Sequence, residues 1–118
     1  QAVEQLSRSG RRLIAGCRGE TVRLLEPEEL VRIYASAGKV LASDGRETYT
    51  LRLRLYEAEA QLDPHRFVRI SNSELVNLAR VQSFDLSLTG TIRVRLSDGT
   101  VTYVSRRYVS KLKKQLGL

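Results

Sequence analysis

The sequence of 118 residues contains no methionine or tryptophan, one cysteine, one histidine and two prolines. Because Cys17 has no second cysteine to pair with, an internal disulfide is excluded, and a reducing cytoplasm is the setting that we expect. One cysteine together with His65 cannot supply the four ligands of a structural zinc site. We therefore expect neither a metal ion nor a cofactor, and we interpret His65 as a solvated loop residue.

The sequence also lacks a long hydrophobic run. No stretch approaches the roughly 18 apolar residues that a membrane span needs, and no secretory signal stands at the start. Hydrophobic residues make up 42% and charged residues 28%, which is typical of a soluble globular domain. We expect no membrane partner. Since the chain begins at Gln1 and has no methionine, we interpret it as a piece of a longer product.

Acidic residues are scarce in the second half of the chain. Residues 1–60 hold ten Lys/Arg and nine Asp/Glu, whereas residues 61–118 hold ten Lys/Arg and only four Asp/Glu. The last twenty residues have five basic side chains and no acid: Arg106, Arg107, Lys111, Lys113 and Lys114. A one-sided basic surface favours a polyanion such as nucleic acid, because neutralised phosphates release counterions. The alternative at this point is a solvated helix face that aids solubility.

Two regions are predicted from the distribution of turns and apolar runs. Residues 1–20 form an N-terminal tail, with a short helix as the alternative, and residues 21–118 form one mainly β domain. Short strands are expected between glycine-, proline- and aspartate-containing turns. The predicted strands are Thr21–Leu25, Val31–Ala37, Lys39–Ser43, Arg46–Thr50, Phe67–Ile70, Val81–Leu86, Thr91–Leu96 and Thr100–Val104.

Two Asp-Gly pairs mark predicted hairpins. Asp44-Gly45 is interpreted as a type I′ turn, which needs positive φ at both central residues, and Asp98-Gly99 closes the clearest hairpin. Around the second turn Ile92, Val94 and Leu96 point to one face, while Arg93 and Arg95 point to the other.

Helices are few in the predicted domain. Leu51–Leu62 fits both a strand and a helix, and we interpret it as a helix because its second half is rich in Glu and Ala. Ser71 and Glu74 have capping-box spacing, which predicts a helical turn after the strand that ends at Ile70. Ser105 is the predicted N-cap of a last helix, with Tyr108, Leu112 and Leu116 as its buried stripe.

Two strings in the second half carry a family resemblance: "RFVRISNSELVNLARVQSF" (66–84) and "IRVRLSDGTVTYVSRRYVSKLKK" (92–114). In this order and at this spacing they resemble the second half of a LytTR-type DNA-binding domain, and the resemblance extends from about Thr21 to the C-terminus. It implies an elongated, mainly β sandwich of small antiparallel sheets with two short helices. It also implies a bacterial transcriptional regulator in which loop residues enter successive major grooves of DNA.

The resemblance implies base contacts from three places. These are the corner after the strand Phe67–Ile70, the start of the last helix, and an early loop at Ser36–Lys39. The matching base readers are Asn72 and Arg107, and Lys111 and Lys114 would lie near phosphates. The complete predicted DNA-binding set is Ser36, Lys39, Ser71, Asn72, Arg106, Arg107, Lys111 and Lys114.

Each of these residues has a simpler interpretation as well. Asn72 is a common turn residue, Arg107 could be a solvent-facing arginine, and Arg106 could pair with a carboxylate. Many family members have His and Arg at the corner where this chain has Ser71 and Asn72. An acidic Glu74 beside DNA would be unfavourable unless it turned back to cap a helix.

The sequence therefore predicts sequence-specific binding of double-stranded DNA, with a homodimer on paired half-sites. Two alternatives remain open: a sequence-tolerant nucleic-acid binder, and a protein-interaction module whose basic C-terminal helix docks on an acidic partner. No Ser-His-Asp set and no phosphate-cradling glycine loop is visible, so we expect neither an enzyme nor a small-molecule substrate.

Overall fold

The computed structural model describes residues Leu13–Leu118, and its first element lies within the region predicted to be a tail. Strand β1 spans Ile14–Arg18 and pairs with β2, Thr21–Leu25, through the turn at Gly19. Cys17 is therefore a half-buried strand residue and not a tail residue. The rest of the predicted tail or short helix, residues 1–12, lies outside the described residues.

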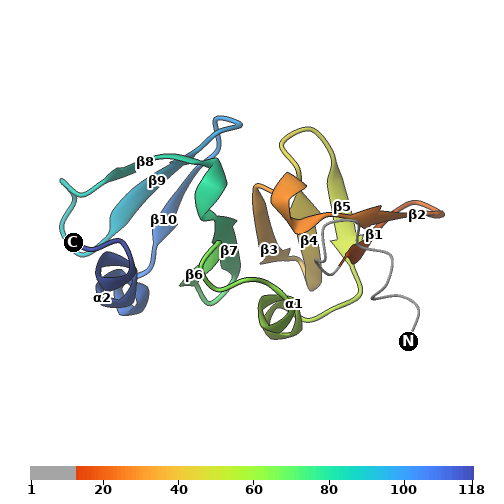
Figure 1. The fold of residues 1–118 in the computed structure, drawn as a ribbon, viewed down its shortest axis with the longest axis horizontal. Helices are drawn as coiled ribbons and strands as arrows, with labels where there is room; N and C mark the ends of the chain where they lie inside the picture. Colours follow the sequence, from red (N-terminus) through yellow and green to blue (C-terminus); the bar gives the residue numbers. More distant parts are fainter. Residues whose placement is uncertain (1–12) are drawn as a thin grey trace.

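Seven of the strands form one antiparallel sheet (Figure 1). Their order across the sheet is β2-β1-β5-β4-β3-β7-β6. Its remaining members are β3 (Arg32–Ser36), β4 (Lys39–Ser43), β5 (Thr48–Leu51), β6 (Phe67–Ser71) and β7 (Glu74–Asn77). One 3-10 turn, η2 (Pro27–Glu29), separates β2 from β3, in keeping with the turn expected at a proline.

A smaller sheet and the last helix form the other end of the molecule. The strands β8 (Val81–Asp85), β9 (Ile92–Leu96) and β10 (Val101–Val104) pair in the order β10-β9-β8. Helix α1 is Leu55–Gln61 and helix α2 is Arg106–Gln115. The principal extents are 45 × 29 × 22 Å, so the predicted elongated, mainly β architecture with two short helices is confirmed.

The segment 51–62, which fits both a strand and a helix, begins at the end of a strand and continues as a helix. Leu51 ends β5, and the helix begins four residues later at Leu55. Its first turn is closed by Glu57, whose Oε1 accepts a hydrogen bond from the Arg54 backbone N–H at 2.8 Å. The helical interpretation is thus correct for the second half of the segment.

The first hairpin has a different turn from the one predicted. Ser43 pairs with Thr48, which leaves Asp44–Glu47 as the loop. Gly45 has a φ of 96°, but Asp44 does not share the positive φ that a type I′ turn needs. Instead, Asp44 Oδ1 accepts hydrogen bonds from the backbone N–H groups of Arg46 and Glu47, at 2.8 and 2.7 Å. The carboxylate, and not a left-handed backbone, stabilises this loop.

The capping box predicted at Ser71 and Glu74 is wrong. Glu74 begins strand β7, and the chain turns tightly between β6 and β7. The helical turn comes later, as the 3-10 turn η3 (Leu78–Arg80), where the side chain of Asn77 accepts from the Ala79 N–H at 3.0 Å. The pattern failed because buried pairing of β7 with β3 and β6 outweighs a local cap.

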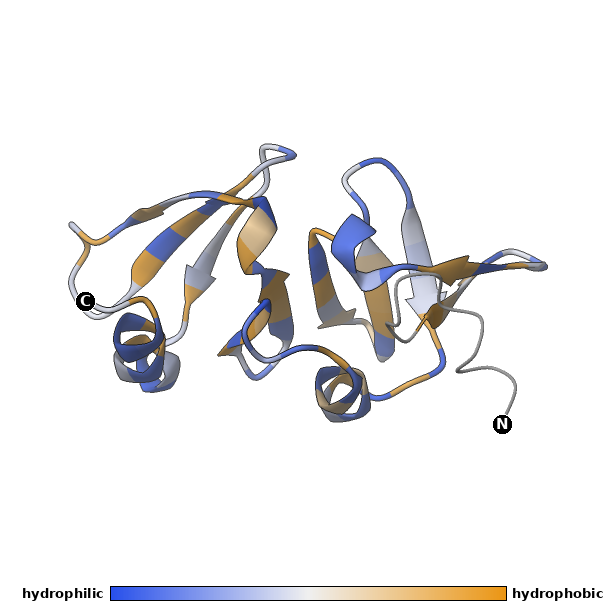
Figure 2. Ribbon diagram, viewed as in Figure 1, coloured by the Kyte–Doolittle hydropathy of each residue, from blue (hydrophilic) through white to orange (hydrophobic). Residues whose placement is uncertain are grey.

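Two hydrophobic clusters fill the molecule. One is formed by residues of the large sheet and α1, and the other by residues of β6, β7, the small sheet and α2. Strand β7 contributes Leu75 to the first and Val76 to the second, since neighbouring side chains point to opposite faces. In Figure 2, α2 is largely hydrophilic along its ribbon, in keeping with one buried stripe through Leu112.

Candidate nucleic-acid interface

Ser71–Ser73 form a tight corner between β6 and β7. The Ser71 hydroxyl accepts from the Ser73 backbone N–H at 3.1 Å, and the Ser73 carbonyl accepts from the Ala35 N–H at 2.8 Å. The second bond ties the corner to β3. Asn72 stands exposed at the tip, on a backbone that is held on both sides.

Arg69 holds the same corner from within. Its Nη1 donates to the backbone carbonyls of Ser71 at 3.4 Å and Asn72 at 3.2 Å, while its Nη2 pairs with Glu59 Oε1 of α1 at 3.1 Å. The Arg69 side chain is only 14% exposed. Through these bonds the mostly buried guanidinium of Arg69 connects α1 to the corner.

The start of α2 is placed beside β6 by a backbone bond. The Ser105 N–H donates to the Ile70 carbonyl at 2.8 Å, so the helix begins next to the strand that leads into the corner. Ser105 has the extended backbone of an N-cap, as predicted, but its hydroxyl makes no capping bond. Arg107 is exposed in the first turn.

The corner and the helix start together line an open hollow of about 650 Å³, here called the corner hollow. Four of the eight residues in the predicted DNA-binding set line it. The complete lining is Ser71, Asn72, Ser73, Ser105, Arg106 and Arg107. Tyr108 connects the helix start to the corner, because its phenol donates a hydrogen bond to Asn72 Oδ1 at 3.1 Å.

Arg106 does not pair with a carboxylate within the part of the chain that the structure describes. Its guanidinium lies over Gly90, where an added Cβ would come within 3.3 Å of Nη2. The charge of Arg106 therefore remains on the surface beside the corner hollow.

A second hollow reaches from Asn72 to the hairpin between β3 and β4, and we call it the hairpin hollow. It is lined by three basic residues that the sequence prediction missed and by Lys39, which it included: Lys39, Arg52, Arg54 and Arg69. Ser36 pairs with Lys39 at the end of the hairpin and is exposed, but it does not line the hollow. The early loop and the corner thus share one side of the molecule.

The missed arginines carry a recognisable signal. Arg52 and Arg54 alternate with Leu51, Leu53 and Leu55, so they point outward wherever those leucines point inward. Arg69 lies between the buried residues Val68 and Ile70 of β6. Alternation places Arg52 and Arg54 on the outer face, whereas Arg69 lies on the same face of β6 as the buried Phe67 and is only 14% exposed. Only the fold brings all three beside Asn72.

Lys111 and Lys114 lie on α2 beyond the corner hollow. Lys111 lines a smaller hollow between α1 and α2, which also contains Glu59 and Gln115. Lys114 is exposed and lines neither the corner hollow nor the hairpin hollow. Both follow Arg107 at helical spacing, four and seven residues on, and therefore share its face of the helix.

The acids nearest to these hollows are neutralised. Glu59 pairs with Arg69, and Glu74 is a buried residue of β7 whose Oε2 lies 2.8 Å from Arg32 Nε. In contrast, Lys39, Arg52 and Arg107 make no ion pair with another described residue. The surface around Asn72 is consequently positive. Glu74, which would be unfavourable beside DNA, is buried and paired with Arg32 instead.

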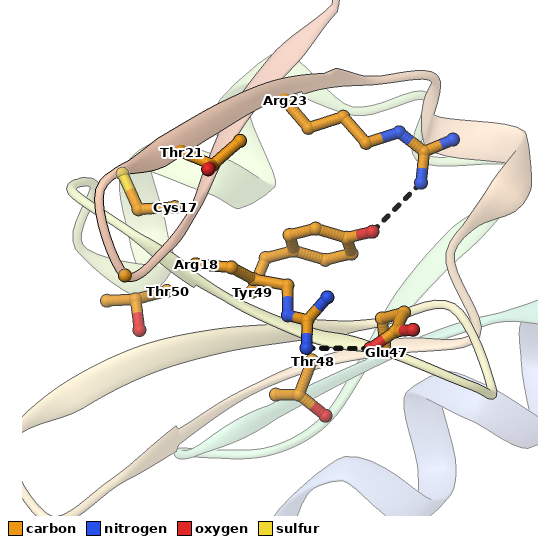
Figure 3. Close-up of a pocket in the computed structure, with 9 residues that line it drawn as sticks. Cys17, Arg18, Thr21, Arg23, Glu47, Thr48, Tyr49 and Thr50 are labelled. Atoms are coloured by element: carbon orange, nitrogen blue, oxygen red, sulfur yellow. Dashed lines mark hydrogen bonds and ion pairs between the residues drawn. The ribbon is translucent and has the colours of Figure 1, made fainter.

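Another hollow, of about 790 Å³, lies at the far end of the molecule, around Tyr49 (Figure 3). The Tyr49 ring lies between two guanidinium groups, and Arg23 Nη1 donates to its hydroxyl at 2.8 Å. Arg18 pairs with Glu47 at 3.0 Å. The charged groups of this hollow form ion pairs, and none of the residues predicted to bind DNA lines it.

Metal-binding clusters are absent from the described residues. Within Leu13–Leu118, no three His, Cys, Asp or Glu residues come together as a metal site would require. Neither helix there is long and apolar enough to cross a membrane. His65 is exposed, as predicted, with Nδ1 3.3 Å from Asp63 Oδ1.

Known proteins share both the sequence pattern and this arrangement of strands. A family model described as the LytTr DNA-binding domain matches residues 20–117. Two sequences from Staphylococcus aureus strains NCTC 8325 / PS 47 and COL are named as uncharacterized HTH-type transcriptional regulators. Each is 33% identical over 117 residues, which cover 99% of this chain and 78% of the relative.

A solved LytTr DNA-binding domain from Bacillus cereus has the same fold. It superposes with a TM-score of 0.86 at 21% identity, over 90% of this chain and 97% of the solved chain. The two α-helices described here are separated in sequence by β6 to β10. They are therefore not the consecutive pair of a helix-turn-helix, whatever name the relatives carry.

Proposed function

Because the chain belongs to the LytTR DNA-binding domain family, we propose that it binds double-stranded DNA sequence-specifically and regulates transcription. The proposal rests above all on one observation. Asn72 and Arg107, which lie far apart in the sequence, line the same corner hollow, and Tyr108 beside Arg107 donates a hydrogen bond to Asn72. Amide and guanidinium groups are the side chains best suited to reading base edges in a major groove.

The dimensions of the molecule support contacts in more than one groove. Its long axis measures 45 Å, whereas one turn of B-DNA advances about 34–36 Å. The corner hollow and the hairpin hollow meet at Asn72 and continue to Lys39. We assign base contacts to Asn72 and Arg107 and contacts from the early loop to Ser36 and Lys39.

The remaining polar residues are assigned to the DNA backbone. Ser71 and Arg106 flank the base readers, Arg52 and Arg54 extend the positive surface toward the hairpin, and Lys111 and Lys114 extend it along α2. Phosphate contacts fix register and contribute most of the non-specific affinity.

We further propose that two copies bind paired half-sites in the cytoplasm, without catalysis. The candidate interface supports binding without catalysis, because its groups are hydrogen-bond donors and cations that suit an anionic polymer. Membership of a family of bacterial DNA-binding domains supports the compartment.

Selection from random duplexes, followed by binding titrations at several salt concentrations, tests the function. A defined motif with a large specific-to-nonspecific ratio supports the proposal. Uniform, steeply salt-dependent binding would show a sequence-tolerant binder instead. No duplex binding at low salt would favour a protein-interaction module that docks on an acidic partner.

Asn72→Ala and Arg107→Ala should each weaken binding to the selected motif by about 1–3 kcal/mol and affect random duplex far less. Both side chains are exposed, so the melting temperature should scarcely change. Arg46→Ala is a matched control, because Arg46 is exposed in the loop at the opposite end of β4 from Lys39. Full discrimination by both Ala variants would show that these residues do not read bases.

A further inference from the structure

Tyr108 contacts both of the residues proposed to read bases. Its hydroxyl donates to Asn72 Oδ1 at 3.1 Å, across 36 residues of sequence. Its ring lies 5.7 Å from the guanidinium carbon of Arg107. Tyr108 is itself half-buried and packs on the hydrophobic cluster beneath α2, so it provides a fixed reference for both side chains.

The bond from Tyr108 decides which way the Asn72 amide faces. A carboxamide has an oxygen that accepts and an NH₂ group that donates, and its function depends on which of them points outward. Here Oδ1 is engaged by the phenol, while Nδ2 has no hydrogen-bond partner among the described residues. The backbone carbonyl of Asn72 does not readily replace Oδ1 as an acceptor for a ligand, because it already accepts a hydrogen bond from Arg69 Nη1 at 3.2 Å.

An asparagine that presents donors selects bases that present acceptors. In the major groove guanine offers two acceptors, N7 and O6, whereas adenine offers the N7 acceptor beside the N6 amino donor. Bidentate pairing of asparagine with adenine needs Oδ1 to accept from that amino group. In this chain Tyr108 uses one of the two lone pairs of Oδ1 and holds the oxygen toward the phenol, and it therefore competes with that pairing.

We propose that Tyr108 is a positioning residue that fixes Asn72 as a hydrogen-bond donor, so that this chain prefers guanine over adenine at the base facing Asn72. The proposal rests on the function proposed above and names the base chemistry of its corner site. It also gives the hydroxyl and the ring separate roles: the hydroxyl sets the Asn72 preference, and the ring supports Arg107.

The test uses the full chain and the duplex motif selected by the wild type. Variant Asn72→Ala first identifies the base position whose preference depends on Asn72. At that position the wild type should bind guanine roughly tenfold more tightly than adenine. Tyr108→Phe, which removes only the hydroxyl, should abolish or reverse this preference and leave all other positions unchanged.

Two matched variants isolate the effect. Tyr103→Phe removes a phenol hydroxyl from the 50% exposed Tyr103 on β10 and should change no base preference. Tyr108→Leu also removes the ring and should weaken the preference at the Arg107-dependent position as well. In the unbound protein, the Asn72 side-chain NH₂ resonances should shift in Tyr108→Phe and stay in place in Tyr103→Phe.

Failure of this inference is distinct from failure of the proposed function. If no duplex motif is selected, the proposed function itself is wrong. If a motif is selected but adenine is preferred at the Asn72-dependent position, or if Tyr108→Phe leaves the guanine preference intact, only the role of Tyr108 is overturned.

Discussion

Two asparagines five positions apart show how the environment of a residue determines its role. Asn77 is 0% exposed; its Nδ2 donates to the Leu30 carbonyl at 2.8 Å and its Oδ1 accepts from Ala79 at 3.0 Å. Asn72 is exposed at the corner, where its side-chain Oδ1 accepts from Tyr108 and its Nδ2 has no partner among the described residues. Asn77 therefore satisfies buried backbone groups, while Asn72 retains donors for a ligand.

Glu74 joins the two sheets. Its Oε2 lies 2.8 Å from Arg32 Nε on β3, and its Oε1 accepts from the Thr102 hydroxyl on β10 at 2.7 Å. Arg32 in turn lies over the Tyr34 ring, 3.8 Å from its centroid. This bridge sets the position of the corner relative to the strand that leads into α2.

Glu74→Ala should lower the free energy of unfolding by about 3 kcal/mol, because it leaves the guanidinium of Arg32 buried without its counter-charge. Arg32 is only 21% exposed in its side chain. Ser71→Ala, the other member of the rejected capping box, should cost less than about 1 kcal/mol, since it loses only a local turn bond. Chemical denaturation measures both; equal losses would contradict the bridging role of Glu74.

Helix α2 has a buried face and a basic face. Tyr108, Leu112 and Leu116 pack on the hydrophobic cluster. Arg107, Lys111 and Lys114 lie close together on another face, whereas Lys113 is turned away from them by the helical periodicity. The helix therefore combines a buried stripe with a basic stripe that continues from the corner hollow.

Lys111→Ala and Lys114→Ala should each weaken binding to all duplexes alike. The slope of log K against log salt should become shallower by about 0.9 for each phosphate that the variant no longer neutralises. Lys113→Ala removes the same charge from a different face and should change the slope less. Equal slopes for all three variants would show that net charge, and not the stripe, sets the affinity.

The end of β8 carries the most perturbed carboxylate described. Asp85 Oδ1 accepts from the Ser87 hydroxyl and backbone N–H at 2.7 and 2.9 Å, and Arg93 of β9 binds its other oxygen. The Ser87 bonds, aided by Arg93, lower the pKa of Asp85 to about 2. All of these bonds favour the ionised form, and the bond from Arg93 connects β8 to β9.

Asp85 should make folding pH-dependent in acid. Its pKa in the folded chain lies below the value of about 3.9 expected when unfolded, so its stabilisation is present above pH ~4 and is lost as the pH falls toward ~2. Asp85→Asn should reduce the pH dependence of the melting temperature in this window. Ser87→Ala removes the hydroxyl bond but keeps the backbone N–H bond, so it should raise the Asp85 pKa, which carboxyl NMR titration measures directly. An unchanged titration would exclude the Ser87 hydroxyl as the main cause of the lowered pKa.

At the scale of the whole molecule, β7 links two hydrophobic clusters into one body. All four of its residues are buried, and it pairs with β3 on one side and β6 on the other. Figure 1 shows β6 and β7 standing between α2 and α1. A strand shared by both clusters makes separate unfolding of the two ends unfavourable.

Ile92→Ala, in the cluster beneath α2, should lower the free energy of unfolding by about 2–5 kcal/mol. Native-state hydrogen exchange should show the same loss of protection in β4, which contributes to the other cluster, as in β9. Leu25→Ala in the opposite cluster is the reciprocal variant and should lower protection in β9 as well. Unchanged protection in β4 for Ile92→Ala would mean that the two ends unfold independently.

The sequence by itself determined the elements whose signals are local. The alternation of Ile92, Val94 and Leu96 with arginines predicts a strand with one buried face, and these three side chains are buried. The spacing of Tyr108, Leu112 and Leu116 likewise predicts α2. The two motif strings identified the family, because their order and spacing reflect this whole arrangement of strands.

Tertiary structure decided what depends on partners distant in the chain. Ser71 and Glu74 have the spacing of a helix cap, but cross-strand pairing and the Arg32 bridge outweigh that local preference. Asn72 and Tyr108 are 36 residues apart, so no local pattern could predict their bond. Arg52 and Arg54 look like ordinary outward-facing residues, and Arg69 like one arginine in a buried strand, until folding gathers them beside Asn72. A side chain's direction is local, whereas its neighbours are set by the packing of the whole chain.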